Sequence, residues 1–481
     1  MAQNCAGGSL AAYIPTPANP WNVAKAKHLY NRLGFGANVN ETQAAMLLSP
    51  GQLVDTLISD AVNAPLPAPP SWYNWTASNY TNINTQRVEQ YKEWYIQWLQ
   101  DMLQTGVREK MALFWHNHFV TRFVDYKCPS YMYEYHKLLQ IHALGNFKTF
   151  LKEMAKTPAM LFFLDGRLNR KNGPNENYAR ELFELFTLGV NNGYTQQDIT
   201  EATRALTGYT NVTAECGAVT FDPAQFDSTP KTVFGVTANY DFDSLHDLIF
   251  NERAVQVSQF IAAKIYTHFV HPLPNQPIID GMAQTFRNNN FDIQPMLKEL
   301  FKSEHFFDLD VMCVQIKSPV ESIIMLIKES NLPYNSQIIE SAGYLTVDMG
   351  QQLFNPIDVS GWNGNRAWIN STAITKRWEA QSLYLDYVLT ALNKEKLREL
   401  AIDTSGNSNN VAIVAQRITD FFIPKGLENT ADYAGATIAL KGTVPQNYFD
   451  LGLWNLQFQY VPEQVWNLMK WIIRRPEFQL M

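Results

Sequence analysis

The 481-residue sequence lacks the segments that would tie a chain to a membrane or to a nucleic acid. It has no run of 18 apolar residues, so we expect no membrane-spanning helix. It has no tract of five basic residues and a net charge of −7, so we expect no nucleic-acid partner. The first residues show neither a charged start nor a long apolar core, so no signal peptide is visible. These absences leave a globular chain, in agreement with a hydrophobic content of 46%.

Three common catalytic motifs are missing as well. The sequence contains no GxSxG, no HExxH and no GxxxxGK[ST]. These absences remove the simplest cases of a serine hydrolase of the α/β type, a zinc protease and a P-loop enzyme. Other kinds of enzyme stay open.

Cysteine is scarce, and the four cysteines are far apart: Cys5, Cys128, Cys216 and Cys313. Because no CxxC occurs, a zinc ribbon is excluded. Two alternatives remain open, namely one or two disulfides in an exported protein, or four inert thiols. Cys5 could carry a lipid anchor if a leader had been removed before it.

The stretch from 172 to 209 has the densest set of charges on otherwise apolar helices in the sequence. Pro174 suits a first helical turn, where its missing N–H is not needed. Glu176, Arg180 and Glu184 then follow at i, i+4 spacing, which predicts ion pairs along one side of the helix. A structural charge lattice and a catalytic or metal site are both consistent with this pattern.

A second short helix is expected after residue 195. Thr195 and Asp198 form a variant capping box at its start. Arg204 on this helix and Glu181 on the preceding one lack a partner in helical register. They are therefore the first charges to consider for chemistry.

Two histidines stand near the end of the helix predicted for residues 107–119. His118 lies on the apolar face of this helix, whereas His116 is about 200° away on the helical wheel. From a regular helix, a pair at i, i+2 cannot chelate one metal. An inward histidine is more often a hydrogen-bonded core residue than a ligand.

Two further regions attract attention as ligand contacts. His28 and Arg32 are one turn apart, on the side of their predicted helix opposite its apolar face. The turn-dense loop 354–370 combines Asp358, Trp362 and Trp368, a mixture that suits a ligand-lining loop. A loop folded back and plugged by its two tryptophans is the alternative.

The helical periodicities predict a mainly α fold, a large multi-helical domain over residues 21–481. Residues 1–20 read as an extended arm. The period changes within 210–240, where the runs 218–222 and 232–236 predict a small β-hairpin insertion near 216–236.

Several motifs, in order along nearly the whole chain, resemble the bacterial family catalogued as domain of unknown function 1800. The stretch 172–209 carries the most specific of them, PNENYARELFELFTLGV followed by GYTQQDITEATRALTGY. The others are HLYNRLGFGA (28–37), EKMALFWHNHFVT (109–121), ALGNF (143–147), PKTVFG (230–235), IKSPVE (316–321), FNPIDVSGWNGNRAWIN (354–370) and the terminal PEFQL. One departure concerns the position before PKTVFG, where the family usually has His-Asp and this chain has Phe226-Asp227. We therefore place no metal on Asp227.

The resemblance implies a mainly helical protein, often exported by bacteria, and thus an extracytoplasmic location. Relatives are often encoded beside proteins that look like sulfatases and alkaline phosphatases. The resemblance supplies no reaction, no cofactor and no metal.

Two hypotheses of function follow. The first is a non-catalytic binding or scaffold protein that acts with another exported protein or a cell-surface polymer. The second is an extracytoplasmic hydrolase that uses a Glu/His/Arg cluster, with or without a divalent metal. Its candidate catalytic residues are Glu181, Glu184, His118, Arg180 and Arg204. The candidate substrate-binding residues are His28, Arg32, Asp358, Trp362 and Trp368.

Overall fold

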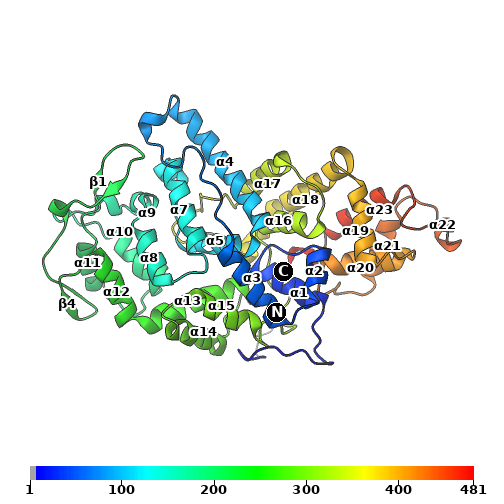
Figure 1. The fold of residues 1–481 in the computed structure, drawn as a ribbon, viewed down its shortest axis with the longest axis horizontal. Helices are drawn as coiled ribbons and strands as arrows, with labels where there is room; N and C mark the ends of the chain where they lie inside the picture. Colours follow the sequence, from blue (N-terminus) through cyan, green and yellow to red (C-terminus); the bar gives the residue numbers. More distant parts are fainter. Residues whose placement is uncertain (1–6) are drawn as a thin grey trace.

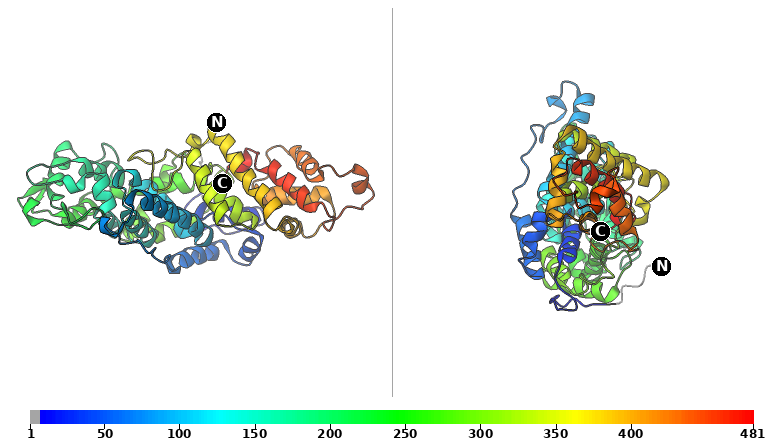
Figure 2. Two further views of the ribbon diagram at one scale, coloured as in Figure 1. Left: turned by 90° about the horizontal axis from the view of Figure 1, so that it is seen from above. Right: turned by 90° about the vertical axis from the view of Figure 1, so that its right-hand side faces the viewer.

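The computed structural model describes residues 7–481 and shows an elongated, mainly α-helical molecule (Figure 1). The two additional views show that the molecule is longer along one axis than along the other two (Figure 2). The predicted fold class, mainly α with a small β insertion, is confirmed. Within residues 7–481, no helix combines the length and the apolar character needed to cross a bilayer.

The middle of the molecule combines the first helices of the chain with two later ones (Figure 1). These helices are α1 (Val23–Leu33), α2 (Val39–Ala45), α3 (Pro50–Asn63), α4 (Ile83–Gln104), α5 (Gly106–His118), α16 (Pro319–Ser330) and α17 (Ser336–Asp348). Ser318 and Glu321 form a capping box at the start of α16, with Pro319 in the first turn. Nearly every side chain of α16 is buried, so this helix forms part of the core beneath the candidate site.

The left-hand part of Figure 1 holds the elements from residue 123 to residue 302. They are α6 (Phe123–Tyr126), α7 (Pro129–Ile141), α8 (Phe147–Ala155), α9 (Pro158–Phe163), α10 (Asn177–Glu181), η3 (Leu182–Thr187), α11 (Gln196–Ala205), α12 (Phe242–Glu252), α13 (Ala254–Phe269), α14 (Gln276–Asn288) and α15 (Ile293–Lys302). The right-hand part holds α18 (Ser371–Ala391), α19 (Glu395–Ser405), α20 (Val411–Phe422), α21 (Asp432–Lys441), α22 (Gln446–Asp450) and α23 (Val461–Ile472). The chain then returns to the middle, where Met481 meets α5 and the pocket described below.

The β insertion differs in detail from the expectation of one hairpin. Two separate hairpins form, each of two antiparallel strands: β1 (Asn211–Val212) with β2 (Val219–Thr220), and β3 (Lys231–Val233) with β4 (Val236–Ala238). The runs 218–222 and 232–236 therefore do not pair with each other. The first run holds β2, which pairs with β1 before it. The second run spans the end of β3, the turn and the start of β4, so it forms a tight hairpin on its own.

The stretch 172–209 forms two helices, as predicted, but the first one starts later and ends differently. Helix α10 begins at Asn177 and not at Pro174. It continues into η3, a π-helical turn in which the N–H of Leu188 donates to the carbonyl of Phe183, 2.9 Å away and five residues earlier. The capping box of Thr195 and Asp198 opens α11, as predicted.

The cysteine alternatives are resolved in favour of a disulfide. Cys128 at the start of α7 is bonded to Cys216 in the β1–β2 loop. Cys313 is a free thiol, and Cys5 lies outside the described residues. The arm pairs with the end of α15 through Tyr13, whose N–H donates to the carbonyl of Lys302 at 2.8 Å. The division into an arm and one helical domain stays a prediction.

Candidate functional site

A cavity of about 350 Å³ opens between α5, α13, the start of α16 and the loop 360–368. Among the residues singled out from the sequence, it brings together His118, Trp362 and Trp368. It adds Lys264, which the sequence did not point to. This pocket is the candidate functional site.

His118 holds a fixed, uncharged position in the pocket wall. One ring nitrogen, Nε2, donates to the carbonyl of Phe186 at 3.2 Å, and the other, Nδ1, accepts from the Lys264 ammonium at 3.2 Å. Burial, together with the neighbouring Lys264 charge, holds the pKa of His118 well below its usual range. His118 is thus a neutral acceptor that positions Lys264.

Lys264 is the unusual charge of this site. Besides His118, its ammonium meets the carbonyl of Leu185 at 3.3 Å and the ring of Phe260 at 4.9 Å from the ring centre. No carboxylate of the described chain is paired with it. Burial lowers the pKa of Lys264 to about 8. At neutral pH the pocket therefore contains a mainly protonated ammonium without a counter-ion.

The π-helical turn η3 supplies the two carbonyls that hold this pair. In a regular α-helix, the carbonyls of Leu185 and Phe186 would accept from N–H groups four residues later. Here the helix ends at once, and Gly189, with φ of 92°, turns the chain away. The carbonyls of Leu185 and Phe186 are left to Lys264 and His118. The most specific motif of the sequence thus reaches the pocket through its backbone.

Asn117 attaches the tryptophan loop to the end of α5. Its amide oxygen accepts from the N–H of Trp362 at 2.7 Å, and its amide nitrogen donates to the carbonyl of Trp362 at 3.2 Å. This close approach requires glycine at position 361, where φ is 83° and a Cβ atom would collide with the Asn117 side chain. The residue before Asn117 on α5, His116, accepts from the N–H of Phe354 at 3.0 Å. Three consecutive residues of α5 therefore fix the loop and Lys264.

The floor of the pocket contains a buried ion pair. Glu321 on α16 is paired with Lys110 on α5. Burial alone would raise the pKa of Glu321, yet Lys110, His268 and the N–H of Ser318 lower it to about 2. This carboxylate is therefore ionised and committed to its partners.

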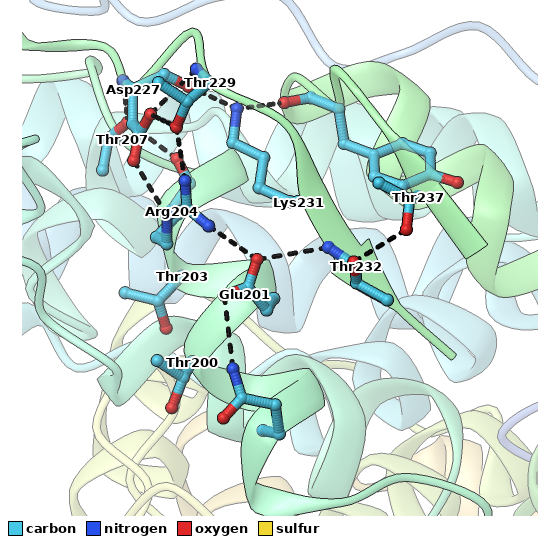
Figure 3. A network of polar contacts seen from close by, with 12 residues as sticks. Thr200, Glu201, Thr203, Arg204, Thr207, Asp227, Thr229, Lys231, Thr232 and Thr237 are labelled. Atoms are coloured by element: carbon cyan, nitrogen blue, oxygen red, sulfur yellow. Dashed lines mark hydrogen bonds and ion pairs between the residues drawn. The ribbon is translucent and has the colours of Figure 1, made fainter. Parts of the chain in front are cut away.

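Arg204 has partners, contrary to the expectation from helical register. Its guanidinium donates to Glu201 at 2.6 Å and to Asp227 at 2.9 Å, and it also contacts Thr229 (Figure 3). Asp227 comes from the loop before β3, which sequence spacing could not place. Although burial opposes it, hydrogen bonds from Thr229 and Arg204 hold the pKa of Asp227 far below its usual value. Arg204 thus ties α11 to the β insertion, away from the pocket.

The predicted pairs of Arg180 form, with Glu176 at 3.2 Å and with Glu184 at 3.3 Å. Within residues 7–481, Glu181 has no hydrogen-bond or ion-pair partner, and burial together with the charge of Glu184 raises its pKa. None of these four side chains lines the pocket. They do not converge with His118.

His28 and Arg32 are buried in the core rather than presented to a ligand. His28 hydrogen-bonds the carbonyl of Phe306 at 3.1 Å. Arg32 donates to the carbonyls of Val270 and Val311 at 2.9 and 3.1 Å. Asp358 is exposed and accepts from Ser360. None of His28, Arg32 and Asp358 lines the pocket, although Ser360 does.

A metal site was part of the hydrolase hypothesis. The described part of the chain contains no group of three His, Cys, Asp or Glu side chains placed to hold an ion. His116 and His118 turn to different partners, Phe354 and Phe186, as their spacing predicted.

Replacing Asn117 with Ala is expected to lower the free energy of unfolding by about 1–3 kcal/mol, because the main-chain groups of Trp362 lose their partners. Hydrogen exchange in residues 360–368 should accelerate at the same time, as measured by mass spectrometry. Asn363→Ala is the matched control, since its exposed side chain makes no hydrogen bond among the described residues and its φ is not positive. Unchanged exchange in this loop would show that Asn117 does not hold it.

The comparisons with known proteins yield one match. The family model described as protein of unknown function (DUF1800) matches residues 28–480. Searches of curated proteins and of solved structures found no match. The match covers nearly the whole chain, and so the chain belongs to this DUF1800 family.

Proposed function

We propose that the chain is a binding protein whose pocket takes an anionic group, such as the acidic end of a cell-surface polymer. Lys264 is the observation that carries this proposal. Its ammonium lines the cavity, is held by two neutral acceptors and lacks a carboxylate partner in residues 7–481. An anion that enters the cavity would provide the missing counter-charge.

The charged residues beneath the pocket also favour a negatively charged ligand. Glu321 is surrounded by the cationic groups of Lys110, Arg32 and Arg377, each of which is buried. Arg32 and Arg377 donate to main-chain carbonyls rather than to carboxylates. Within this group, Lys110 makes the largest contribution to the low pKa of Glu321, about 2. A positive potential in a partly enclosed site attracts anions.

The number of carboxylates in the pocket favours binding over hydrolysis. Hydrolysis of a glycosidic bond usually requires two, one of them able to donate a proton. Among the described residues, the pocket offers one, Glu321, which is ionised and paired with Lys110. Glu181 and Glu184 lie outside this cavity.

An extracytoplasmic location is part of the proposal. The disulfide between Cys128 and Cys216 supports it, because such bonds persist in oxidising compartments and are rare in the cytosol. The expected partner, an exported protein that looks like a sulfatase or phosphatase, stays a prediction.

We expect Lys264→Met to weaken binding of an acidic polysaccharide about 10- to 100-fold, the effect of losing one charge-assisted contact. Affinity electrophoresis in gels that contain polygalacturonate, alginate or neutral dextran measures this. Binding of the native protein should also weaken as the pH rises through about 8, because the ammonium then loses its proton.

Lys264→Arg is the matched variant, since it keeps the charge. Lys264→Met should change the stability at pH 7 little, because the relief from a charge without a counter-ion offsets the loss of the contacts with His118 and Leu185. If Lys264→Met binds the acidic polysaccharides as tightly as the native protein does, the proposal is wrong.

A further inference from the structure

We infer that the anion is a sugar acid, a hexuronate unit whose carboxylate meets Lys264 and whose ring hydroxyls meet two preorganised amides. This inference rests on the proposed function and names the ligand class for the same pocket. The amides belong to Gln315 and Gln351, both of which line the cavity. In each amide, one polar atom is hydrogen-bonded to the main chain and the other has no partner among the described residues.

Gln315 presents an acceptor. Its amide nitrogen donates to the carbonyl of Thr267 at 2.6 Å, on the same helix as Lys264 and one turn further along. The residue is only 6% exposed, yet its oxygen is not among the buried atoms that lack a partner. With no hydrogen bond to another described residue, this oxygen faces the cavity.

Gln351 presents the complementary donor. Its amide oxygen accepts from the N–H of Val320 at 2.9 Å, at the start of α16. The residue is 3% exposed, and its nitrogen is likewise open rather than sealed in the interior. Because the backbone fixes the orientation of both amides, the donor and the acceptor are set before a ligand arrives.

A pocket with a hydrogen-bond donor and an acceptor beside one ammonium is complementary to a ligand that has hydroxyl groups as well as a negative charge. A hydroxyl both donates and accepts, so neighbouring hydroxyls of a sugar ring can meet Gln315 and Gln351. A simple anion such as an aliphatic carboxylate could accept from Gln351, but it has no hydrogen to donate to the oxygen of Gln315. Trp362 and Trp368, each less than 8% exposed, form the apolar wall. At about 350 Å³, the cavity is near the lower end of ligand pockets and suits a terminal unit rather than a long segment.

Isothermal titration calorimetry at pH 7 tests this inference with matched probes. Glucuronate, galacturonate and mannuronate carry both features, glucose lacks the carboxylate, and cyclohexanecarboxylate lacks the hydroxyls. We expect at least one hexuronate to bind about tenfold or more tightly than both reduced probes. Gln351→Met and Gln315→Met, which keep side-chain length, should each weaken hexuronate binding about tenfold. Gln315→Met should leave cyclohexanecarboxylate binding unchanged, because that probe has no hydrogen to donate to the amide oxygen.

The outcomes separate the two claims. Equal binding of hexuronate and cyclohexanecarboxylate, both lost in Lys264→Met, would overturn the sugar-acid inference and keep anion binding. Equal binding of glucose and hexuronate, with no effect of Lys264→Met, would overturn the proposed function itself. No hexuronate binding while acidic polysaccharides still bind through Lys264 would also overturn the inference, because the recognised unit would then be a different anion.

Discussion

Lys110→Met is expected to lower the free energy of unfolding by about 3–5 kcal/mol, since it leaves the carboxylate of Glu321 buried without its cation. Both side chains are almost completely buried, at 1% and 4% exposure. The unpaired carboxylate would still receive the N–H of Ser318 at 2.6 Å, which is insufficient to replace a full charge. Chemical denaturation monitored by tryptophan fluorescence measures the loss.

The pH dependence of this deficit provides a second check. The pKa of Glu321 in the native protein, about 2, is lower than its usual value of 4.5. Its ionised form therefore stabilises the fold above about pH 4.5, and this contribution is lost as the pH falls towards 2. In Lys110→Met the carboxyl can accept a proton more easily, so the deficit should shrink below about pH 4.

The double variant Lys110→Met/Glu321→Gln is the control. Glutamine still accepts the cap hydrogen bond from Ser318 and carries no charge. Most of the lost stability should return. A double variant as unstable as Lys110→Met would show that the loss comes from altered packing around Lys110 and not from the ion pair.

Removing the disulfide is the second large effect that we expect. Cys128 and Cys216 are 88 residues apart in the sequence. In the chain-entropy model, a loop of this length stabilises the native state by about 4–5 kcal/mol. The double variant Cys128→Ser/Cys216→Ser, and the native protein under reducing conditions, should therefore unfold at clearly lower temperature.

Cys313→Ser is the matched control, because Cys313 is free in the structure. Its thermal unfolding should not respond to reduction differently from that of the native protein. If reduction leaves the unfolding temperature of the native protein unchanged, the disulfide does not contribute, and the support that it gives to an extracytoplasmic location is lost.

Interactions that close within one turn of chain could be predicted from the sequence. The pairs of Arg180 with Glu176 and Glu184 follow from helical spacing, and the box of Thr195 with Asp198 follows from the chemistry of helix starts. Both depend on neighbours three or four residues apart, so tertiary structure has little opportunity to change them.

Partners distant in the chain could not be predicted in this way. Arg204 was expected to be free. Its pair with Glu201, three residues earlier, could have been read from helical spacing, whereas the return of Asp227, 23 residues later, could not. The position of the Lys264 ammonium is fixed by His118, which is 146 residues away. No residue of its own helix indicates that Lys264 lines a pocket. Arg32 was placed on a polar face, but in a molecule of several packed layers that face is also covered.

Three of the residues singled out from the sequence line the pocket. His118 was recognised as an inward residue, and Trp362 and Trp368 were recognised as candidates for a ligand contact. The sequence could not show that the π-helical turn η3 would direct two carbonyls at Lys264 and His118. The two carbonyls meet side chains of α5 and α13, which lie far from this turn in the sequence.

The titration of Lys264 tests the account most directly. In protein labelled with ¹³C-lysine, the NMR signal that disappears in Lys264→Met identifies this side chain, and its chemical shift can be followed against pH. We predict a midpoint near 8 in the free protein, because the ammonium is buried without a carboxylate. Bound acidic polysaccharide should move the midpoint upward. A midpoint near the ordinary lysine value of about 10.5, unchanged by acidic polysaccharide, would contradict the account.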